Sequence, residues 1–422
     1  MKEFKIEGGN KLTGTIKISG AKNAALALIP AALLTKKKVK IYNVPNISDI
    51  ENIKEILKHL NVKMKETMEY LEIDSSNLIN DAIPEEISRK LRASYYFMAA
   101  LLGREKKVVM HFPGGCNIGK RPIDQTLKGF TALGAKVNEI NDCYTITANK
   151  LVGSKIYLDI PSVGATINTL IASVLAEGTT IIENVAKEPE IVNVADFLNN
   201  LGAKIIGAGT NRIKIEGVKE LHDGEIKVIP DRIEAGTYII AGALVGDNLK
   251  IENIIPEHLE SLITKLNEMN IKTIVNKNSI TISANTNMHP TNIVTQVYPG
   301  FPTDLQQPIV ALLSVCKGCS IVEETIYENR FNNVEYLNKL GANIKINQRK
   351  LLIEGTNELI GTEVEATDLR AGACLLLAAL YAHGTTTIKN ADYILRGYEN
   401  INQKLRNVGA NIELEEYNKV GI

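Results

Sequence analysis

The hexapeptide Asn200-Leu-Gly-Ala-Lys-Ile205 decides how this chain folds, because close variants of it return along the whole sequence. The other copies, at intervals of about 70 residues, are HLNVKM (59–64), ALGAKV (132–137), EMNIKT (268–273), KLGANI (339–344) and NVGANI (407–412). Self-similarity at a fixed period is typical of a repeated structural unit. The sequence therefore predicts six copies of one unit.

A second string recurs at the same interval as the first and shows what each unit contains. AEGTTIIEN (176–184) matches AHGTTTIKN (382–390), and related strings are KKKVKIYN (36–43), REKKVVMH (104–111), GDNLKIEN (246–253) and CKGCSIVE (316–323). Before each string we expect a short strand, a loop and a helix that is apolar nearly all round, such as 168–176 or 375–382, which is typical of a buried helix. A strand such as 179–182 follows, then a more polar helix such as 190–201, whose Gly suits a helix C-terminus. Another strand completes a βαβαβ-type unit of an α/β protein.

The length predicts two domains, because 422 residues are more than one core usually supports. Six units then give three per domain, and Val228-Ile229-Pro230-Asp231 is the expected crossing point. The last unit stops after a strand at 410–414, and the opening strands at 4–18 have no unit of their own. We therefore expect one domain of residues 1–20 plus 230–422 and another of residues 21–229.

Composition excludes several function classes. Lys plus Arg and Asp plus Glu number 48 each, so the chain as a whole has no electrostatic footprint for nucleic acid or an anionic membrane. The N-terminus has no signal-peptide core, and the apolar stretches 24–34 and 371–382 are shorter than the roughly 18 residues that span a bilayer. Five cysteines, an odd number, suit a reducing compartment. We expect a cytoplasmic protein, and a monomer.

The six equivalent loops that precede the buried helices are the expected place for chemistry. A helix N-terminus attracts anions, and several of these loops also carry Lys or Arg. The alternative is ordinary N-capping by Ser, Thr or Asp. The loops are GAKNAA with Lys22, RKLRAS with Arg89 and Arg92, PSVGAT with Ser162, PDRIEAG with Asp231 and Arg232, FPTDLQ with Asp304, and ATDLRAG with Asp368 and Arg370.

One segment lies outside this pattern, Phe112-Pro-Gly-Gly-Cys116-Asn-Ile-Gly-Lys120-Arg121-Pro122. Its glycines and prolines predict an exposed loop. Most free cysteines are buried small hydrophobes, but a thiol beside Lys120 and Arg121 is placed to have altered acidity and reactivity. The other candidate sites are weaker. Cys316-Lys-Gly-Cys319 lacks the second pair that a zinc site needs, the histidines show no metal spacing, and no dinucleotide or phosphate-loop motif is present.

At these loops the chain resembles the enolpyruvyl transferases that act on UDP-N-acetylglucosamine. The resemblance runs from Leu12 to about Ala410 and rests on GAKNAA, PGGCNIGKRP, SVGAT, EPEIV, PDRIEAGT, FPTDLQ, ENRF, ATDLRAG and RGYEN. It implies a two-domain inverted α/β barrel with the apolar helices inside and a swapped N-terminal strand. It also implies transfer of the enolpyruvyl group of phosphoenolpyruvate to the 3′-hydroxyl of UDP-N-acetylglucosamine through a tetrahedral intermediate, with release of phosphate and no cofactor. In this family the reaction is the first committed step of peptidoglycan synthesis.

The resemblance also implies roles for individual residues. Cys116 corresponds to the general acid and Asp304 to the general base, while Asn23 would hold the reacting hydroxyl. Lys22, Arg121 and Arg396 correspond to a cationic cluster around phosphoenolpyruvate, and Asp368 and Arg370 belong to the same cleft. The positions that match contacts to the nucleotide sugar are Arg92, Arg121, Pro122, Ile123, Asp124, Gln125, Ser162, Val163, Gly164, Ile326 and Arg330 of ENRF. Some relatives carry lysine where this chain has Ile160, which bears on how uridine or diphosphate is held.

Two rival functions remain open at this level. The sister transferase that uses shikimate 3-phosphate shares the fold, but typically has serine at the position of Asn23 and lacks the PGGC loop. A paralogue that binds nucleotide sugar without catalysis is the other rival. Retention of Cys116, Asp304, Lys22 and Arg396 together favours an active enzyme.

Overall fold

The computed structural model describes residues 1–114 and 122–417, which form two compact units. Unit 1 contains Met1–Ser19 and the chain from Pro230 onward, and unit 2 contains the described residues from Gly20 to Ile229. Each unit has its own buried hydrophobic cluster. The chain passes from one unit to the other after Ser19 and again after Ile229.

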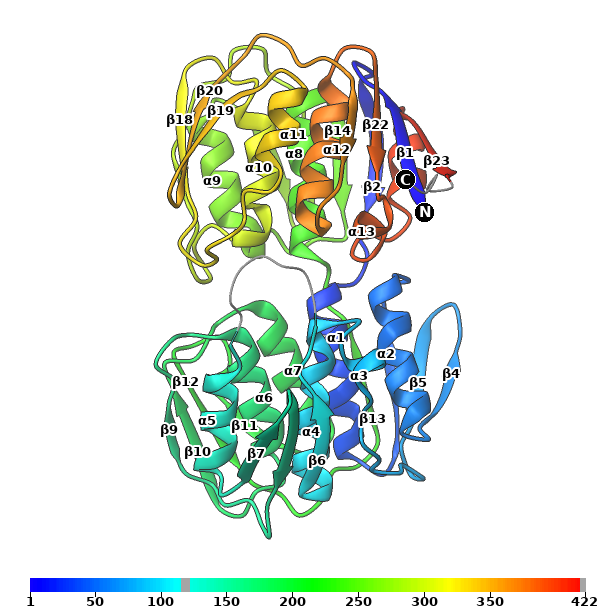
Figure 1. Ribbon diagram of the computed structural model, residues 1–422, viewed down its shortest axis with the longest axis vertical. Helices are drawn as coiled ribbons and strands as arrows, with labels where there is room; N and C mark the ends of the chain where they lie inside the picture. The colour runs from blue at the N-terminus through cyan, green and yellow to red at the C-terminus, as the bar shows by residue number, and fades with distance from the viewer. Residues whose placement is uncertain (115–121, 418–422) are drawn as a thin grey trace. The chain divides into compact units, whose positions relative to one another are not determined.

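The described strands form six small sheets, three in each unit (Figure 1). The strand orders in unit 1 are β21 (Glu363–Glu365), β22 (Thr385–Lys389), β1 (Lys2–Glu7), β23 (Asn411–Glu416); β15 (Thr273–Asn276), β16 (Ser279–Ile282), β14 (Gly246–Glu252), β2 (Leu12–Lys17); and β17 (Ile293–Val294), β18 (Cys319–Glu323), β20 (Lys350–Glu354), β19 (Asn343–Asn347). Those in unit 2 are β11 (Lys204–Ile206), β12 (Arg212–Glu216), β10 (Thr179–Glu183), β9 (Lys155–Tyr157); β13 (Gly224–Lys227), β3 (Lys38–Tyr42), β5 (Tyr70–Asp74), β4 (Lys63–Glu66); and β6 (Lys107–His111), β8 (Cys143–Thr147), β7 (Lys136–Ile140). In the last sheet the leading strand is reduced to a parallel bridge between Ile83 and Met110.

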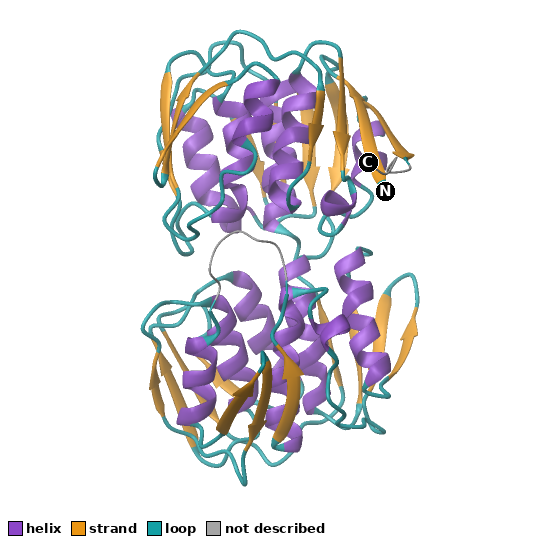
Figure 2. Cartoon of the chain, in the orientation of Figure 1, coloured by secondary structure: helices purple, strands orange, loops and turns teal. Residues whose placement is uncertain are grey.

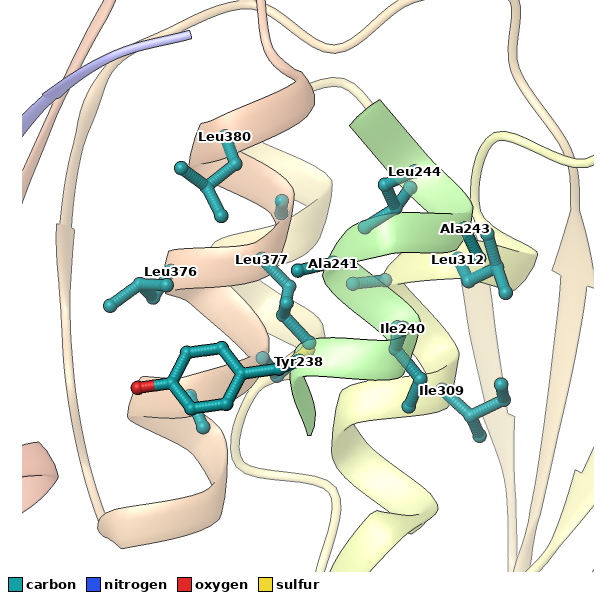
Figure 3. Close-up of a cluster of buried hydrophobic side chains, with 14 of the residues drawn as sticks. Tyr238, Ile240, Ala241, Ala243, Leu244, Ile309, Leu312, Leu376, Leu377 and Leu380 are labelled. Atoms are coloured by element: carbon teal, nitrogen blue, oxygen red, sulfur yellow. The ribbon is translucent and has the colours of Figure 1, made fainter. Parts of the chain in front are cut away.

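Within each unit the helices lie inside and the sheets outside (Figure 2). The inner helices are α1 (Lys22–Ala31), α4 (Tyr96–Glu105) and α6 (Val163–Ser173) in unit 2, and α8 (Arg232–Val245), α10 (Gln306–Leu313) and α12 (Leu369–Tyr381) in unit 1. Nearly all their residues are buried, as expected for helices that are apolar on every side. Figure 3 shows side chains of α8, α10 and α12, among them Ile240, Leu312 and Leu377, gathered in one cluster.

The more polar helices complete each unit. They are α2 (Ser48–His59), α5 (Asp124–Ala132), α7 (Pro189–Asn200), α9 (Glu260–Glu268), α11 (Val334–Lys339) and α14 (Ile401–Arg406). Shorter elements are α3 (Glu85–Ser88), α13 (Asp392–Leu395) and the 3₁₀ turns η1 (Ala32–Leu34), η2 (Arg92–Tyr95), η3 (Pro256–Leu259) and η4 (Thr303–Leu305). None of the described helices is both long and apolar enough to cross a membrane.

All six polar helices end at the repeated hexapeptide, and each end uses a residue in the left-handed region. These residues are Asn61, Gly134, Gly202, Asn270, Gly341 and Gly409, with φ between 58° and 106°. The N–H of the next residue turns back into the helix, as from Ala203 to the carbonyl of Leu198 at 2.9 Å. Because Asn tolerates this conformation better than other side chains, it replaces Gly in the two weaker copies of the repeat. The predicted glycine helix ends are confirmed.

In three copies the second repeated string ends in an asparagine whose side chain joins two neighbouring strands. Asn43, Asn184 and Asn253 have φ of 59°, 56° and 58°, and follow β3, β10 and β14. Their side-chain amides donate to the carbonyls of Val228, Leu158 and Ile18, at 2.9, 2.7 and 2.7 Å. Each of those carbonyls lies just after a leading strand. The asparagine thus fixes the point from which the next loop departs.

Two leading strands belong to a different unit from the helix that follows them in sequence. Strand β2 precedes α1 of unit 2, but pairs in parallel with β14 of unit 1. Strand β13 precedes α8 of unit 1, but pairs in parallel with β3 of unit 2. In addition, β1 lies between β22 and β23, so the first strand of the chain pairs with the last.

The expected bounds of the inner helices were wrong at their N-termini. Helix α6 begins at Val163 and not at 168, and α12 begins at Leu369 and not at 375. The physical reason is N-capping by Ser162 and Asp368, which starts each helix in the polar loop ahead of its apolar run.

Candidate active site

Three of the six loops begin their helices with a capping side chain. The Ser162 hydroxyl accepts from the N–H of Ala165 at 3.3 Å. Asp231 accepts from the N–H groups of Ile233 and Glu234 at 2.8 and 2.9 Å, and Asp368 caps α12 in the same way. Capping therefore accounts for these three residues. Only one carboxylate oxygen of Asp368 is used, since its Oδ2 is buried without a hydrogen-bond partner among the described residues.

Asp304 has a different environment, because two arginines hold its carboxylate. It lies in the turn η4 ahead of α10, and Arg330 Nη2 lies 2.7 Å from its Oδ1. Arg370 Nη2, from the first turn of α12, lies 3.0 Å from its Oδ2. Burial by itself would raise the pKa of Asp304, but the charges and hydrogen bonds of Arg370 and Arg330 outweigh it and hold that pKa well below its usual range. The carboxylate is therefore ionised.

Arg370 is fixed in turn by a directed chain of hydroxyl groups. Thr237 donates its hydroxyl hydrogen to the carbonyl of Ile233 at 2.8 Å, so its oxygen accepts from Tyr398, 2.8 Å away. The Tyr398 oxygen then accepts from Arg370 Nη1 at 3.1 Å. The tyrosine is 1% exposed, and its ring lies 5.5 Å from the guanidinium. Arg370 therefore presents its remaining amino group to Asp304 in one orientation.

Lys22 begins α1, and the adjacent Ala21 makes no side-chain cap at that end of the helix. Its ammonium lies 2.6 Å from Asp49, whose side chain is 1% exposed in the first turn of α2. A cation at a helix N-terminus favours an anionic ligand. Asn23 next to it is exposed, and Arg396 follows α13 as a partly buried residue.

Unit 2 gathers a second group of predicted residues around Arg92. Its guanidinium donates to the carbonyl of Pro113 at 3.3 Å and lies 5.5 Å from the ring of Tyr95. A Cβ at Gly164 would lie 1.5 Å from the Tyr95 hydroxyl oxygen. Only glycine at this position lets Tyr95 lie against α6, so Gly164 contributes to the placement of Arg92.

The segment after Pro122 is anchored through Gln125. Its amide donates to Asp159 at 3.0 Å, and its carbonyl oxygen accepts from the Asp159 N–H at 2.9 Å. Ile123 is buried in the hydrophobic cluster, whereas Pro122 and Asp124 are exposed. Ile160 is 58% exposed.

Residues 6–405 match the family model described as EPSP synthase (3-phosphoshikimate 1-carboxyvinyltransferase). The chain belongs to the enolpyruvyl transferase family. It is 51% identical to the UDP-N-acetylglucosamine 1-carboxyvinyltransferase of Clostridium botulinum, over 98% of this chain and 99% of that protein. It is 50% identical to the UDP-N-acetylglucosamine 1-carboxyvinyltransferase 2 of Bacillus subtilis, over 98% and 96%. The solved structure of the enolpyruvyl transferase NikO from Streptomyces tendae superimposes with a TM-score of 0.89 at 26% identity, covering 98% of this chain and 99% of that one.

The family resemblance inferred from the motifs is thus confirmed, and so is the mixed α/β enolpyruvyl transferase fold. Of the residues that the family motifs single out, the structure brings Asp304, Arg330 and Arg370 into direct contact. Cys116 and Arg121 lie outside the described residues. Within residues 1–114 and 122–417, no group of three or more His, Cys, Asp or Glu side chains could hold a metal ion.

Sequence reasoning missed three residues that hold the predicted ones. Asp49 pairs with Lys22, Tyr398 with Arg370, and Glu324 binds the backbone of Ile326. The burial of Glu324 could have been predicted from the alternation of residues along the strand before it. Glu324 continues the two-residue alternation of the buried Ser320 and Val322 in β18, which points its carboxylate inward.

Proposed function

We propose that this protein transfers the enolpyruvyl group of phosphoenolpyruvate to the 3′-hydroxyl of UDP-N-acetylglucosamine, in peptidoglycan synthesis. The observation that carries the proposal is the ion-paired cluster of Asp304, Arg330 and Arg370, built from FPTDLQ, ENRF and ATDLRAG. Relatives that are about half identical over nearly their whole length carry this activity in their names.

The reaction needs cations, an acid and a base. Phosphoenolpyruvate has a phosphate and a carboxylate, which Lys22, Arg121 and Arg396 would neutralise. The hydroxyl oxygen bonds to C2 while the Cys116 thiol gives its proton to C3, which yields the tetrahedral intermediate. Loss of a proton from C3 and of phosphate from C2 restores the double bond. Asn23 would orient the hydroxyl throughout.

Asp304 is the proposed base, and its surroundings set how it can act. A carboxylate that two arginines stabilise is weakly basic, so it would take the hydroxyl proton as the bond to C2 forms and that proton becomes acidic. Both of its oxygens are occupied by arginine. Each oxygen keeps a second lone pair, which could take the proton while both arginines stay bound.

The remaining predicted residues are proposed to bind the substrates. Ser162 supports this, because its oxygen accepts from the helix while its O–H is left as a donor for a phosphate oxygen. Asp368 is supported by its unpartnered buried oxygen. The others are Arg92, Arg121, Pro122, Ile123, Asp124, Gln125, Val163, Gly164, Ile326, Arg330 and Arg370.

The proposal extends to the architecture and setting of the protein. We infer that the six sheets are six copies of one unit, three in each of two inverted α/β barrels. The domains would be residues 1–20 plus 230–422 and residues 21–229. We propose a cytoplasmic location, which the free cysteines Cys143, Cys316, Cys319 and Cys374 support. We also propose that the protein is a monomer.

Release of phosphate is the direct test. Phosphate should appear only when phosphoenolpyruvate and UDP-N-acetylglucosamine are both present, and shikimate 3-phosphate should not replace the nucleotide sugar. Turnover with shikimate 3-phosphate would favour the sister activity. Tight binding of the nucleotide sugar without phosphate release would favour the non-catalytic paralogue.

Lys22→Ala tests the placement of the cationic cluster. Loss of a charge-assisted hydrogen bond of roughly 1.5–3 kcal/mol should raise the KM for phosphoenolpyruvate about 10- to 100-fold. Calorimetric binding of UDP-N-acetylglucosamine alone should change little, and Lys36→Ala, at an exposed lysine, is the matched control. Equal loss of both affinities would show that the assignment is wrong.

A further inference from the structure

Glu324 is a buried carboxylate to which the mechanism above gives no part. It follows β18 directly and is 1% exposed. Its Oε1 accepts from the N–H groups of Ile326 and Tyr327 at 2.8 and 3.1 Å, and from the Thr295 hydroxyl at 3.0 Å. Its Oε2 accepts from the Thr303 hydroxyl at 2.8 Å. Four donors and a charge-bearing acceptor satisfy one another, as a buried carboxylate requires.

These bonds extend from Glu324 to Arg330 in a fixed direction. Because Thr303 gives its hydroxyl hydrogen to Glu324, its oxygen is left to accept from Arg330 Nη1, 2.8 Å away. The other amino group, Arg330 Nη2, binds Asp304 Oδ1 at 2.7 Å. Hydrogen bonds are therefore donated in one direction, from Arg330 to Thr303 and from Thr303 to Glu324.

A second route joins the same two residues. Glu324 holds the backbone N–H of Tyr327, and the Tyr327 ring lies 5.2 Å from the guanidinium carbon of Arg330. A guanidinium over an aromatic face is attracted to it. Arg330 thus contacts a hydroxyl and a ring, and Glu324 accepts from that hydroxyl and from the backbone N–H of the residue that carries the ring.

We propose that Glu324 is a positioning residue that fixes Arg330 against Asp304 and shapes the turn at Ile326 for the nucleotide sugar. The inference rests on the proposed function, since it assigns Glu324 to the reaction in which Asp304 is the base. Glu324 acts through Thr303, Tyr327 and Arg330, and touches neither substrate.

The proposal requires a carboxylate and not merely a polar side chain. In Glu324→Gln the amide oxygen can keep the donors at Oε1, but the NH₂ group then faces Thr303. The Thr303 oxygen would meet two donors, the amide and Arg330, while its own hydrogen loses its acceptor. The Thr303 hydroxyl must then rotate to find another acceptor, so its oxygen no longer presents a fixed lone pair to Arg330.

Four variants test this in the full-length protein. Glu324→Gln removes the acceptor, and Thr303→Val removes the hydroxyl while keeping its shape. Thr303→Ser restores the hydroxyl. Glu323→Gln is the matched control, because Glu323 is the preceding residue, its side chain is 36% exposed, and it forms an ion pair with Lys350.

The expected result separates the two substrates. Glu324→Gln and Thr303→Val should each lower kcat/KM for UDP-N-acetylglucosamine about 10- to 100-fold, as expected when a buried charged group loses a hydrogen bond. The KM for phosphoenolpyruvate should change less than about twofold, and Thr303→Ser and Glu323→Gln should stay near wild type. The double variant Glu324→Gln/Thr303→Val should be no less active than the less active single variant, since both substitutions disrupt the same chain of hydrogen bonds. If Glu324→Gln does not fold, the Thr303 pair carries the test.

Several outcomes would overturn the proposal. Thr303→Val with wild-type kinetics, effects of the two single variants that add fully, or an equal rise in the KM for both substrates would each do so. If the wild-type protein releases phosphate and Glu324→Gln matches it, the inference alone fails. If the wild-type protein releases no phosphate with either acceptor, the proposed function and the inference fall together.

Discussion

At the scale of single residues, Asp304 shows how two cations change a carboxylate. Arg330 and Arg370 have side chains that are 4% and 7% exposed, whereas Asp304 retains 27% exposure. Removal of the carboxylate would leave two nearly buried charges without their partner. Breaking such a pair is strongly destabilising, and the partial exposure of Asp304 places the expected loss near the lower end, at about 3 kcal/mol.

Asp304→Asn should therefore lower the free energy of unfolding in a pH-dependent way. The folded pKa of Asp304 lies well below the unfolded value of about 3.9, so its contribution is complete above that value and is lost as pH falls toward the folded pKa. The difference between wild type and variant should be constant from about pH 8 to pH 5 and should shrink toward pH 3. Urea unfolding across this range measures it, with the exposed Asp223→Asn as control. A difference that grows on acidification would contradict the ion-pair account.

Cys116 is the residue whose chemistry is predicted from sequence alone. A small phosphonate epoxide that mimics phosphoenolpyruvate should alkylate it, faster in the presence of UDP-N-acetylglucosamine. Cys116→Asp should keep much of the activity, because a carboxylic acid can still donate a proton, and Cys116→Ala should lose most of it. Peptide mapping of the label provides the measurement.

Two other thiols serve as internal controls for that labelling. Burial raises the pKa of Cys316 to about 11 and that of Cys374 to about 12, so both remain protonated near neutral pH and react slowly. Cys319 is exposed at the start of β18. Label on Cys319 in preference to Cys116 would defeat the assignment of the general acid.

At the scale of elements, the asparagine that follows each of the strands β3, β10 and β14 has two separable functions. Asn184 adopts a left-handed conformation, and its side chain holds the carbonyl of Leu158. Asn184→Ala should lose the hydrogen bond, worth about 1 kcal/mol, and add a left-handed strain of about 1–2 kcal/mol. Asn184→Gly should lose only the hydrogen bond, since glycine adopts this conformation without strain.

The order of stability should then be wild type, Asn184→Gly, Asn184→Ala, by the midpoint of urea unfolding. Asn211→Ala, at an exposed position of the following loop, is a control for the loss of a surface amide. Equal midpoints for the two Asn184 variants would show that the left-handed conformation costs nothing here.

At the scale of the whole molecule, unit 1 depends on strands from both ends of the chain. In the sheet order β21-β22-β1-β23, Phe4 and Ile6 are completely buried, and Phe4 pairs with Leu414 across the sheet. Contacts of such high sequence separation form late, because the entropy of closing the long loop is lost before they stabilise anything.

Phe4→Ala should therefore destabilise unit 1 by about 3–5 kcal/mol and leave unit 2 unchanged, because each unit has its own hydrophobic cluster. Hydrogen exchange should accelerate at β22 and β23 but not at α4 or α6. Lys5→Ala, one residue along on the outer face, should have little effect. Acceleration in both units alike would show that the two clusters unfold as one.

The sequence alone predicted much of this fold, because its strongest signals are local. A glycine or asparagine at the end of each polar helix indicates a left-handed backbone conformation, which most residues avoid. Because this signal occurs six times, it indicates the repeat. The apolar sequences of the inner helices likewise predict that these helices are buried on every side. These properties depend on a few neighbouring residues, so they can be recognised without knowledge of the partner elements.

Tertiary structure decided which polar residues meet. Ser162, Asp231 and Asp304 occupy equivalent loops. Ser162 and Asp231 cap helices, whereas Asp304 accepts from two arginines, in segments 26 and 66 residues away in sequence. The domain bounds expected from the sequence already group β2 with unit 1 and β13 with unit 2, but the pairing of β2 with β14 and of β13 with β3 is non-local and follows only from the structure. The sequence identifies the charged residues and the strands. It does not identify which charges form ion pairs or which strands pair, because both depend on backbone packing that brings distant segments within hydrogen-bonding distance.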